Sequence, residues 1–319
     1  MHKYIARRLL LMIPTLIGVS VVVFLIMRIV PGDVATMILM GPTGELGARQ
    51  EDIAALRQKL GLDRPLVVQY LNWMGGMLTL NVGESLWSSK PVFEEVLERL
   101  PLTLELALLA ILISAGIALS TGVLSAIRQD TWVDYLFRAV SIAGLSVPNF
   151  WMGTLTILIL SRYFLWSPPL GYVHVYEDPL TNLQQLIWPA LILGYSQAAV
   201  TSRMTRSSML EVLREDYVRT AWAKGLPEPA VVMRHAFRNA LIPVLTLSAI
   251  QLGTLIGGTV IMETIFTLPG IGRYLVDSIF HRDYPVTQTL ITIMAVKFVV
   301  INLIVDLLYG LIDPRIRYA

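Results

Sequence analysis

The sequence predicts an all-α polytopic membrane protein with six transmembrane helices and both termini in the cytoplasm. Its mean hydropathy of +0.64, with 55% hydrophobic and 15% charged residues, is too apolar for a soluble protein of 319 residues. Six apolar stretches are each long enough to cross about 30 Å of hydrocarbon, which takes about 20 helical residues. Lys and Arg are also distributed very unevenly between the connections.

The six predicted spans cover approximately residues 9–30, 102–127, 139–161, 183–202, 239–262 and 285–311. Arg28 lies near the end of the first span, where a long side chain can reach the interface. No small-residue cleavage site follows that span, so we interpret it as a retained helix rather than a signal peptide. Pro148, Pro189 and Pro243 are expected to kink or begin helices, which packed membrane helices tolerate.

The basic residues of the short connections predict the orientation. Fourteen lie on one side: Lys3, Arg7, Arg8, Arg128, Arg138, Arg203, Arg206, Arg214, Arg219, Lys224, Arg234, Arg238, Arg315 and Arg317. Three lie on the other: Arg162, Arg273 and Arg282. Because short cytoplasmic loops retain positive charge, the first side is assigned to the cytoplasm.

The long connection 31–100 is predicted to form an external loop domain. It opens with the chain-reversal signal Pro31-Gly32-Asp33, and Ile53, Leu56 and Leu60 follow a helical pattern that ends before Gly61. A flexible loop is the alternative, but several large apolar residues exceed what a disordered segment needs: Tyr70, Leu71, Trp73, Met74, Leu78 and Leu80. The remaining divisions are residues 1–30, a transmembrane core at 101–311 that includes the internal connection 203–238, and a cytoplasmic tail at 312–319.

The internal connection 203–238 is the most informative part of the chain. Leu210, Leu213, Tyr217 and Ala221 recur every three to four residues and predict one apolar helix face, with charged residues elsewhere. Gly225 is expected to end this helix in a left-handed turn, and Pro227 suits the first turn of a second short helix. On these grounds alone, a basic amphipathic linker lying on the membrane surface explains the segment equally well.

Several runs of residues carry a family resemblance. They are 5–33, 60–65 with 69–70, 99–104, 206–226 with 234–243, 263–273, 282–286, and 306–310 with 313–315. Together these runs, which span nearly the whole chain, closely resemble binding-protein-dependent ABC importer permeases. More narrowly, they look like the B-type subunit of the dipeptide, oligopeptide and nickel group. The resemblance implies the permease fold in a bacterial or archaeal cytoplasmic membrane.

The resemblance implies a docking site for an ATPase subunit in the internal connection, a cytoplasmic coupling helix between the fourth and fifth spans. Its residues would be Tyr217, Arg219, Thr220, Ala221, Ala223, Lys224, Gly225 and Leu226. The general superfamily pattern is Glu-Ala-Ala, then glycine, then Ile-x-Leu-Pro. This chain matches the glycine with Gly225 but departs at Arg219 and Thr220, and has His235, Phe237 and Arg238 in the later positions. That departure resembles the peptide group's own variant.

The implied partners are a homologous second permease subunit, two ATP-binding subunits, an external solute-binding protein and membrane lipid. The chain has no Gly-x-x-x-x-Gly-Lys-Ser/Thr phosphate loop, so ATP and magnesium are expected on the ATPase subunits and no cofactor on this chain. A net charge of +2 is too small to indicate a nucleic-acid partner.

Lys297 and Asp306 are charged residues within the sixth predicted span, and both are candidates for the substrate path. They are nine residues apart and do not share a helical face. The alternative role for Asp306 is to stabilise packing near the cytoplasmic end of the span. The four histidines, at 2, 174, 235 and 281, are scattered along a chain without cysteine. We therefore expect no metal site.

The function that the resemblance implies is an ATP-driven importer permease for peptides, without enzymatic activity of its own. Nickel chelates, glutathione and opines are alternative solutes for the same scaffold. An ion-gradient transporter would predict buried acidic groups and broken helices in repeat-related positions, which the sequence lacks. A membrane enzyme would need a catalytic constellation, and no Ser-His-Asp or metal-ligand spacing is present.

Overall fold

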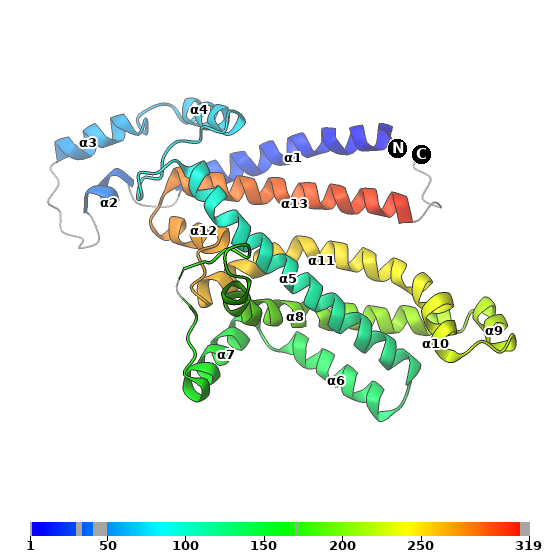
Figure 1. The fold of residues 1–319 in the computed structure, drawn as a ribbon. Helices are drawn as coiled ribbons and strands as arrows, with labels where there is room; N and C mark the ends of the chain where they lie inside the picture. The colour runs from blue at the N-terminus through cyan, green and yellow to red at the C-terminus, as the bar shows by residue number, and fades with distance from the viewer. Residues whose placement is uncertain (1, 30–33, 41–49, 170, 313–319) are drawn as a thin grey trace. The chain divides into compact units, whose positions relative to one another are not determined.

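The computed structural model describes residues 2–29, 34–40, 50–169 and 171–312, and these residues are almost entirely helical or in short connections (Figure 1). The helices are α1 His2–Ile29, α2 Val34–Met40, α3 Gln50–Lys59, α4 Leu66–Leu78, α5 Val92–Ile127, α6 Trp132–Ser146, α7 Asn149–Phe164, α8 Pro179–Leu213, α9 Asp216–Ala223, α10 Glu228–Ala230, the π-helix η1 Val231–Phe237, α11 Arg238–Ile265, α12 Ile271–Phe280 and α13 Tyr284–Ile312. Within the described ranges the one β feature is an isolated bridge between Glu84 and Pro91. The predicted all-α class is confirmed.

Three helical stretches of the described chain are long and apolar enough to cross a membrane: Leu10–Ile29, Val92–Ile127 and Tyr284–Ile301. A fourth candidate consists of α6 and α7 together, which are bent by 99° at the short break between them. The third predicted span, 139–161, is therefore not one continuous helix. A total of six spans and the cytoplasmic location of the termini remain predictions.

The break between α6 and α7 follows from Pro148. Proline lacks a backbone N–H and disfavours helical geometry in the residue before it. Val147 accordingly adopts an extended conformation with ψ of 122°, and Pro148 becomes the residue that precedes α7. Pro148 therefore does not kink one continuous helix but separates two helices that are bent by 99°.

The chain divides into two compact units. Unit 1 consists of Met1–Leu100 with Tyr274–Val300, and unit 2 of Pro101–Arg273 with Ile301–Arg317. The segment predicted as an external domain belongs to unit 1, together with α1 and much of α13.

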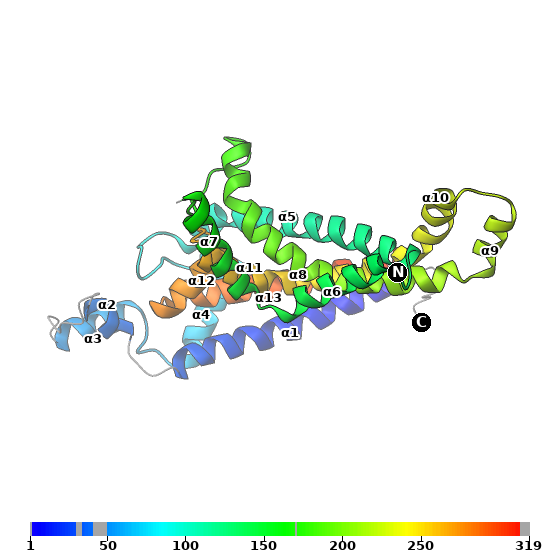
Figure 2. The ribbon, with the colours of Figure 1, turned by 90° about the horizontal axis from the view of Figure 1, so that it is seen from below.

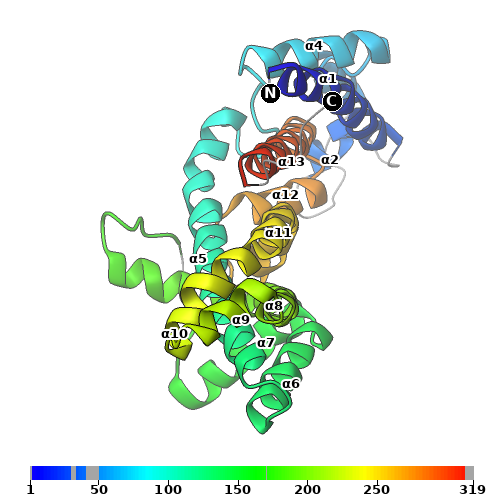
Figure 3. The ribbon, with the colours of Figure 1, turned by 90° about the vertical axis from the view of Figure 1, so that its right-hand side faces the viewer.

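In unit 2, α8 is the central element, with α6, α7 and α11 against it (Figure 3). The hydrophobic core comprises Leu102, Leu106, Ala110, Leu186, Ala190, Ile192, Leu193, Leu255, Met262, Phe266 and Leu268. Two glycines bring α5 and α8 close together: a Cβ at Gly194 would lie 2.8 Å from the Ala110 carbonyl oxygen, and one at Gly122 would lie 2.6 Å from the Thr205 Cβ. Small residues of this kind let membrane helices approach closely.

In unit 1, aromatic side chains join α1 to α4. The Phe24 ring, 2% exposed, lies 5.5 Å from the Tyr70 ring and 6.3 Å from the Trp73 ring. The Ser20 and Tyr70 hydroxyls are hydrogen-bonded at 2.8 Å. The apolar residues that distinguished this segment from a disordered loop therefore include two that pack against α1.

Candidate functional site

The segment between α8 and α11, residues 214–237, forms an elbow in which α9 and α10 extend past the ends of α8 and α11 (Figures 1 and 2). The helix α8 ends at Leu213, and the Arg214 and Glu215 N–H groups donate to the carbonyls of Glu211 and Val212 at 3.2 and 3.1 Å. The predicted continuous apolar face is therefore wrong, because the chain turns between Leu213 and α9. Tyr217 does not continue the face of α8 and is 42% exposed.

The helix α9 is held in place by a small apolar cluster. Val218 is fully buried and Ala221 is 4% exposed, and both pack with the buried Val231 of η1. Val212 and Leu213 from the end of α8 cover the same cluster. Removing these side chains from water is the principal interaction that attaches α9 to the rest of the elbow.

Gly225 ends α9 in the predicted left-handed turn, with φ of +74°. The Gly225 N–H donates to the Trp222 carbonyl at 2.9 Å, and the Leu226 N–H donates to the Ala221 carbonyl at 3.5 Å. This pair of hydrogen bonds is the Schellman motif, which usually requires glycine. A Cβ at Gly225 would have no other atom within 4 Å, so the requirement is conformational rather than steric.

The second half of the elbow differs from the prediction. Pro227 precedes α10, but α10, η1 and α11 follow one another without interruption, so there is no separate second short helix. Val232 and Ala236 of η1 pack with Ala126, Met209 and Ala240. Wide helical turns of this type are frequent at functional sites.

The outer face of α9 combines charged and apolar groups. The exposed Arg219 side chain donates to the Asp216 carboxylate at 3.3 Å, and the Thr220 hydroxyl donates to the Asp216 carbonyl at 2.9 Å. Ala223 and Lys224 are exposed. Trp222 and Leu226 are 45% and 36% exposed, and Tyr217 accepts a hydrogen bond from the Asn239 side chain at 2.8 Å. This face offers both apolar area and hydrogen-bonding groups to another protein.

A buried ion pair that the sequence analysis missed stabilises the base of the elbow. The completely buried Asp134 carboxylate accepts two hydrogen bonds from Arg206, at 2.8 and 2.7 Å, one from the Ser125 hydroxyl at 2.5 Å and one from the Asp130 N–H at 3.1 Å. The hydrogen bond with Asp134 raises the pKa of Arg206. The carboxylate thereby joins the end of α5, the start of α6 and α8.

A second buried carboxylate holds residues 263–273 in their conformation. Glu263, fully buried, accepts from the Thr103 hydroxyl at 2.9 Å and from the Arg273 N–H at 3.0 Å, while Thr103 accepts from the Ile271 N–H at 3.0 Å. These contacts satisfy N–H groups in the first turn of α12. A Cβ at Gly270 would lie 2.4 Å from the Glu263 carboxylate, so this position must be glycine for the carboxylate to fit.

The structure does not bring the other two candidates into this site. Lys297 is half-buried in α13 of unit 1. The Asp306 side chain lies outside the described residues, although its backbone is helical. In the described part of the chain no three His, Cys, Asp or Glu side chains are grouped as metal ligands would be.

Comparisons with known proteins agree with the helical architecture. The amino-terminal family model of binding-protein-dependent transport system membrane components matches residues 1–107, and the model "Binding-protein-dependent transport system inner membrane component" matches residues 118–318. At the level of fold, the chain is similar to an inward-facing MetNI methionine ABC transporter chain, with a TM-score of 0.57 and 18% identity over 70% of this chain and 99% of that one. An amino acid ABC transporter gives a TM-score of 0.52 at 12% identity over 68% and 94%.

Curated relatives are similar along their whole length. The di/tripeptide transport system permease protein DppB of Pseudomonas aeruginosa is 44% identical, over 100% of this chain and 99% of the relative. The dipeptide transport system permease protein DppB of Escherichia coli K12 is 40% identical over the same shares. The resemblance stated from the sequence is confirmed, and this chain belongs to the family of inner membrane permease components of binding-protein-dependent ABC transport systems.

Proposed function

We propose that this chain is the membrane-spanning permease subunit of an ATP-driven importer for di- or oligopeptides. The family membership supports the role of permease, and the names of the relatives support peptides as the solute. Nickel chelates, glutathione and opines are alternative solutes that the same scaffold would accommodate.

The structure of the elbow is the main support for coupling between this chain and an ATPase subunit. Its exposed helix α9 is fixed to the chain by the buried Val218, Ala221 and Val231, and its second half leads directly into α11. An ATPase subunit that grips the α9 face would therefore move α11 as well, in the rigid-body manner of many switching proteins. Arg219 and Lys224 contribute little affinity individually, since exposed ion pairs are worth about 0–1 kcal/mol. Apolar contacts with Trp222 and Leu226 would supply most of the binding energy.

The proposal assigns the partners. Two ATP-binding subunits carry ATP and magnesium, a homologous second permease completes the translocation path, and an external binding protein delivers the solute. The complex resides in a cytoplasmic membrane with its elbow on the ATPase side. Lys297 and Asp306 remain candidates for the path.

Proteoliposomes that contain the whole complex test this function. With the binding protein and a labelled dipeptide outside and ATP inside, we expect uptake that needs ATP and is insensitive to ionophores. An ion gradient that drives uptake in the absence of ATP would instead support a secondary transporter. Uptake of a nickel chelate but not of peptides would support the role of ATP-driven importer and contradict peptides as the solute.

The Gly225→Val substitution tests the elbow within that assay. A β-branched residue is strained at a φ of +74°, so the turn after α9 should distort and peptide uptake per ATP hydrolysed should fall several-fold. Gly171→Val is the matched control, because Gly171 also has a positive φ, of +81°, and open space around its Cβ position, but lies outside the elbow. Undiminished coupling in Gly225→Val, with normal membrane levels of both variants, would contradict the assignment of the elbow.

A further inference from the structure

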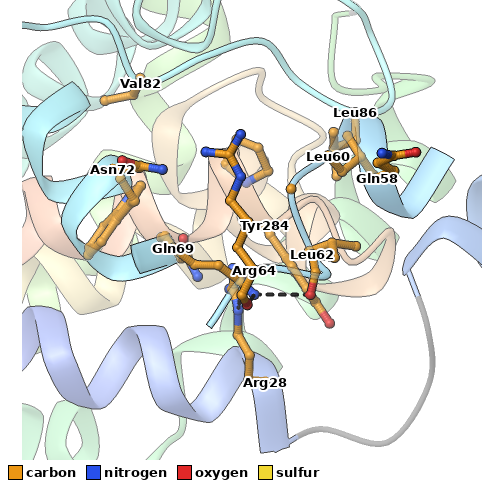
Figure 4. Close-up of a pocket in the computed structure, with 14 residues that line it drawn as sticks. Arg28, Gln58, Leu60, Leu62, Arg64, Gln69, Asn72, Val82, Leu86 and Tyr284 are labelled. Atoms are coloured by element: carbon orange, nitrogen blue, oxygen red, sulfur yellow. Dashed lines mark hydrogen bonds between the residues drawn. The ribbon is translucent and has the colours of Figure 1, made fainter. Parts of the chain in front are cut away.

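Unit 1 contains a cavity of about 340 Å³ between α1, α4 and the beginning of α13 (Figure 4). Arg28 from α1 extends toward Gln69 and Leu62, while Tyr284 comes from α13 (Figure 4). The described lining residues include two arginines, Arg28 and Arg64, and no carboxylate. The described lining of the cavity therefore carries a net positive charge.

The Arg28 guanidinium is held in a fixed position. Its Nε and Nη2 donate to the Gln69 Oε1 at 3.3 and 3.0 Å, and it lies over the Phe24 ring at 4.2 Å. Gln69 is itself oriented, because its Nε2 donates to the Leu62 and Arg64 carbonyls at 3.1 and 2.8 Å. A planar guanidinium positioned in this way is suited to binding a carboxylate.

Three hydrogen-bond donors of the cavity lining have no acceptor among the residues that the structure describes. They are the Arg28 Nη1, the Trp73 Nε1 and the Gln288 Nε2, and each of these atoms is buried. Gln288 is only 2% exposed. An unsatisfied buried donor costs about 1–3 kcal/mol, so three around one cavity call for an explanation. All three are donors, and one belongs to a cation, which favours an anionic acceptor over a neutral one.

We propose that this cavity binds the terminal carboxylate of a peptide, with Arg28 as its counter-ion and Trp73 and Gln288 as additional donors. This inference rests on the proposed function and deepens it by naming a recognition site for the solute. The volume lies at the small end of the range of about 300–1,000 Å³ for ligand pockets, so it accommodates the end of a peptide rather than a long chain. A carboxylate side chain of the binding protein has the same chemistry, and the experiment separates the two sources.

Direct binding of a small peptide tests the site. The complex in lipid nanodiscs, without its binding protein, is titrated with labelled L-alanyl-L-alanine and with the C-terminal amide of the same dipeptide. We expect saturable binding of the acid and at least tenfold weaker binding of the amide. Arg28→Gln should weaken binding of the acid at least tenfold and remove the preference. Arg57→Gln is the matched control, because Arg57 belongs to the same unit, pairs with Asp63 at 3.3 Å and does not line the cavity.

Gln288→Leu gives a second test that does not depend on breaking a hydrogen bond. Replacing an unpartnered buried amide with an apolar group of similar size should leave the peptide-free protein at least as stable. The same variant should nevertheless bind the dipeptide several-fold more weakly, a combination that a merely structural glutamine would not produce.

The outcomes separate this inference from the proposed function. If the wild-type complex takes up peptides but binds acid and amide equally, or if Arg28→Gln and Gln288→Leu bind normally, the inference is wrong and the function stands. If Arg28→Gln weakens association with the binding protein but not with the dipeptide, the carboxylate belongs to the binding protein and the inference is also overturned. If the complex takes up no peptide at all, both the proposed function and this inference are wrong.

Discussion

The Asp134 site of unit 2 and the Arg28 cavity of unit 1 use similar groups in opposite ways. Asp134 is a buried anion that accepts four hydrogen bonds from three residues, and no buried side-chain polar atom of that group lacks a partner. Arg28 is a half-buried cation with one nitrogen that has no acceptor in the described chain, beside two further unpartnered donors. A satisfied network rigidifies a fold. Unsatisfied buried donors need an explanation, and for those beside the Arg28 cavity we propose a ligand.

The largest effect is expected from Asp134→Ala. It removes the acceptor of Arg206, Ser125 and the Asp130 N–H, and breaking a buried ion pair costs about 3–5 kcal/mol. The membrane level and thermal stability of the purified complex should fall sharply. Asp216→Ala removes the exposed partner of Arg219 and should leave both unchanged. Equal behaviour of the two variants would show that the Asp134 site is not a structural network.

An intermediate effect is expected from Gly270→Ala. The new Cβ would lie 2.4 Å from the Glu263 carboxylate, and overpacking of this kind costs about 1–3 kcal/mol. Gly116→Ala is the control, since its Cβ would have no atom within 4 Å outside its own helix. Denaturation of the detergent-solubilised protein measures both. A Gly270→Ala variant as stable as Gly116→Ala would contradict the close approach to Glu263.

The smallest expected effect is a loss of stability at alkaline pH. It involves one partly buried tyrosine in each unit, so the two units can be compared. Burial and the Glu105 carboxylate raise the pKa of Tyr172 in unit 2, and burial and the Glu95 carboxylate raise the pKa of Tyr274 in unit 1. Tyr172 donates to Glu105 at 2.7 Å, and Tyr274 donates to Glu95. Above the ordinary tyrosine pKa of about 10, the unfolded chain loses these protons first, so stability should decrease as pH rises through that value.

Thermal melting of the complex at pH values on either side of about 10 measures this dependence. Tyr172→Phe and Tyr274→Phe should each reduce the loss of melting temperature at high pH. Tyr163→Phe is a suitable control, because Tyr163 is 76% exposed. A loss that is unaffected by either of the first two substitutions would contradict the assignment to these tyrosines.

Local chemistry was predictable from the sequence wherever one residue determines the backbone. Gly225 was expected to end a helix in a left-handed turn, which its φ confirms. Pro148 was expected to kink or begin a helix, and it directly precedes α7. The end of α8 at Leu213 was not foreseen, because neither glycine nor proline marks that turn and the apolar spacing continues through it. Here the burial of Val218 and Ala221 against η1 overrides the simple periodicity.

Long-range pairing was beyond the reach of sequence patterns. Arg206 lies 72 residues from Asp134, and Glu263 lies 160 residues from Thr103. Each is an ordinary polar residue in its own segment, and only the packing of the helices reveals its partner. The cavity likewise combines Arg28, Trp73 and Gln288, three residues without any common motif. The span containing Arg28 was recognised, but its arginine was interpreted as interfacial.

The shortness of α9 has a consequence for attempts to inhibit the complex. It has eight residues, well below the roughly 12–15 at which isolated helices become appreciably populated in water. Its conformation therefore depends on the Val218, Ala221 and Val231 cluster, to which η1 contributes. A synthetic fragment copied from residues 214–227 would be largely unfolded and a weak competitor, whereas one bridged covalently to hold the helix would compete far better.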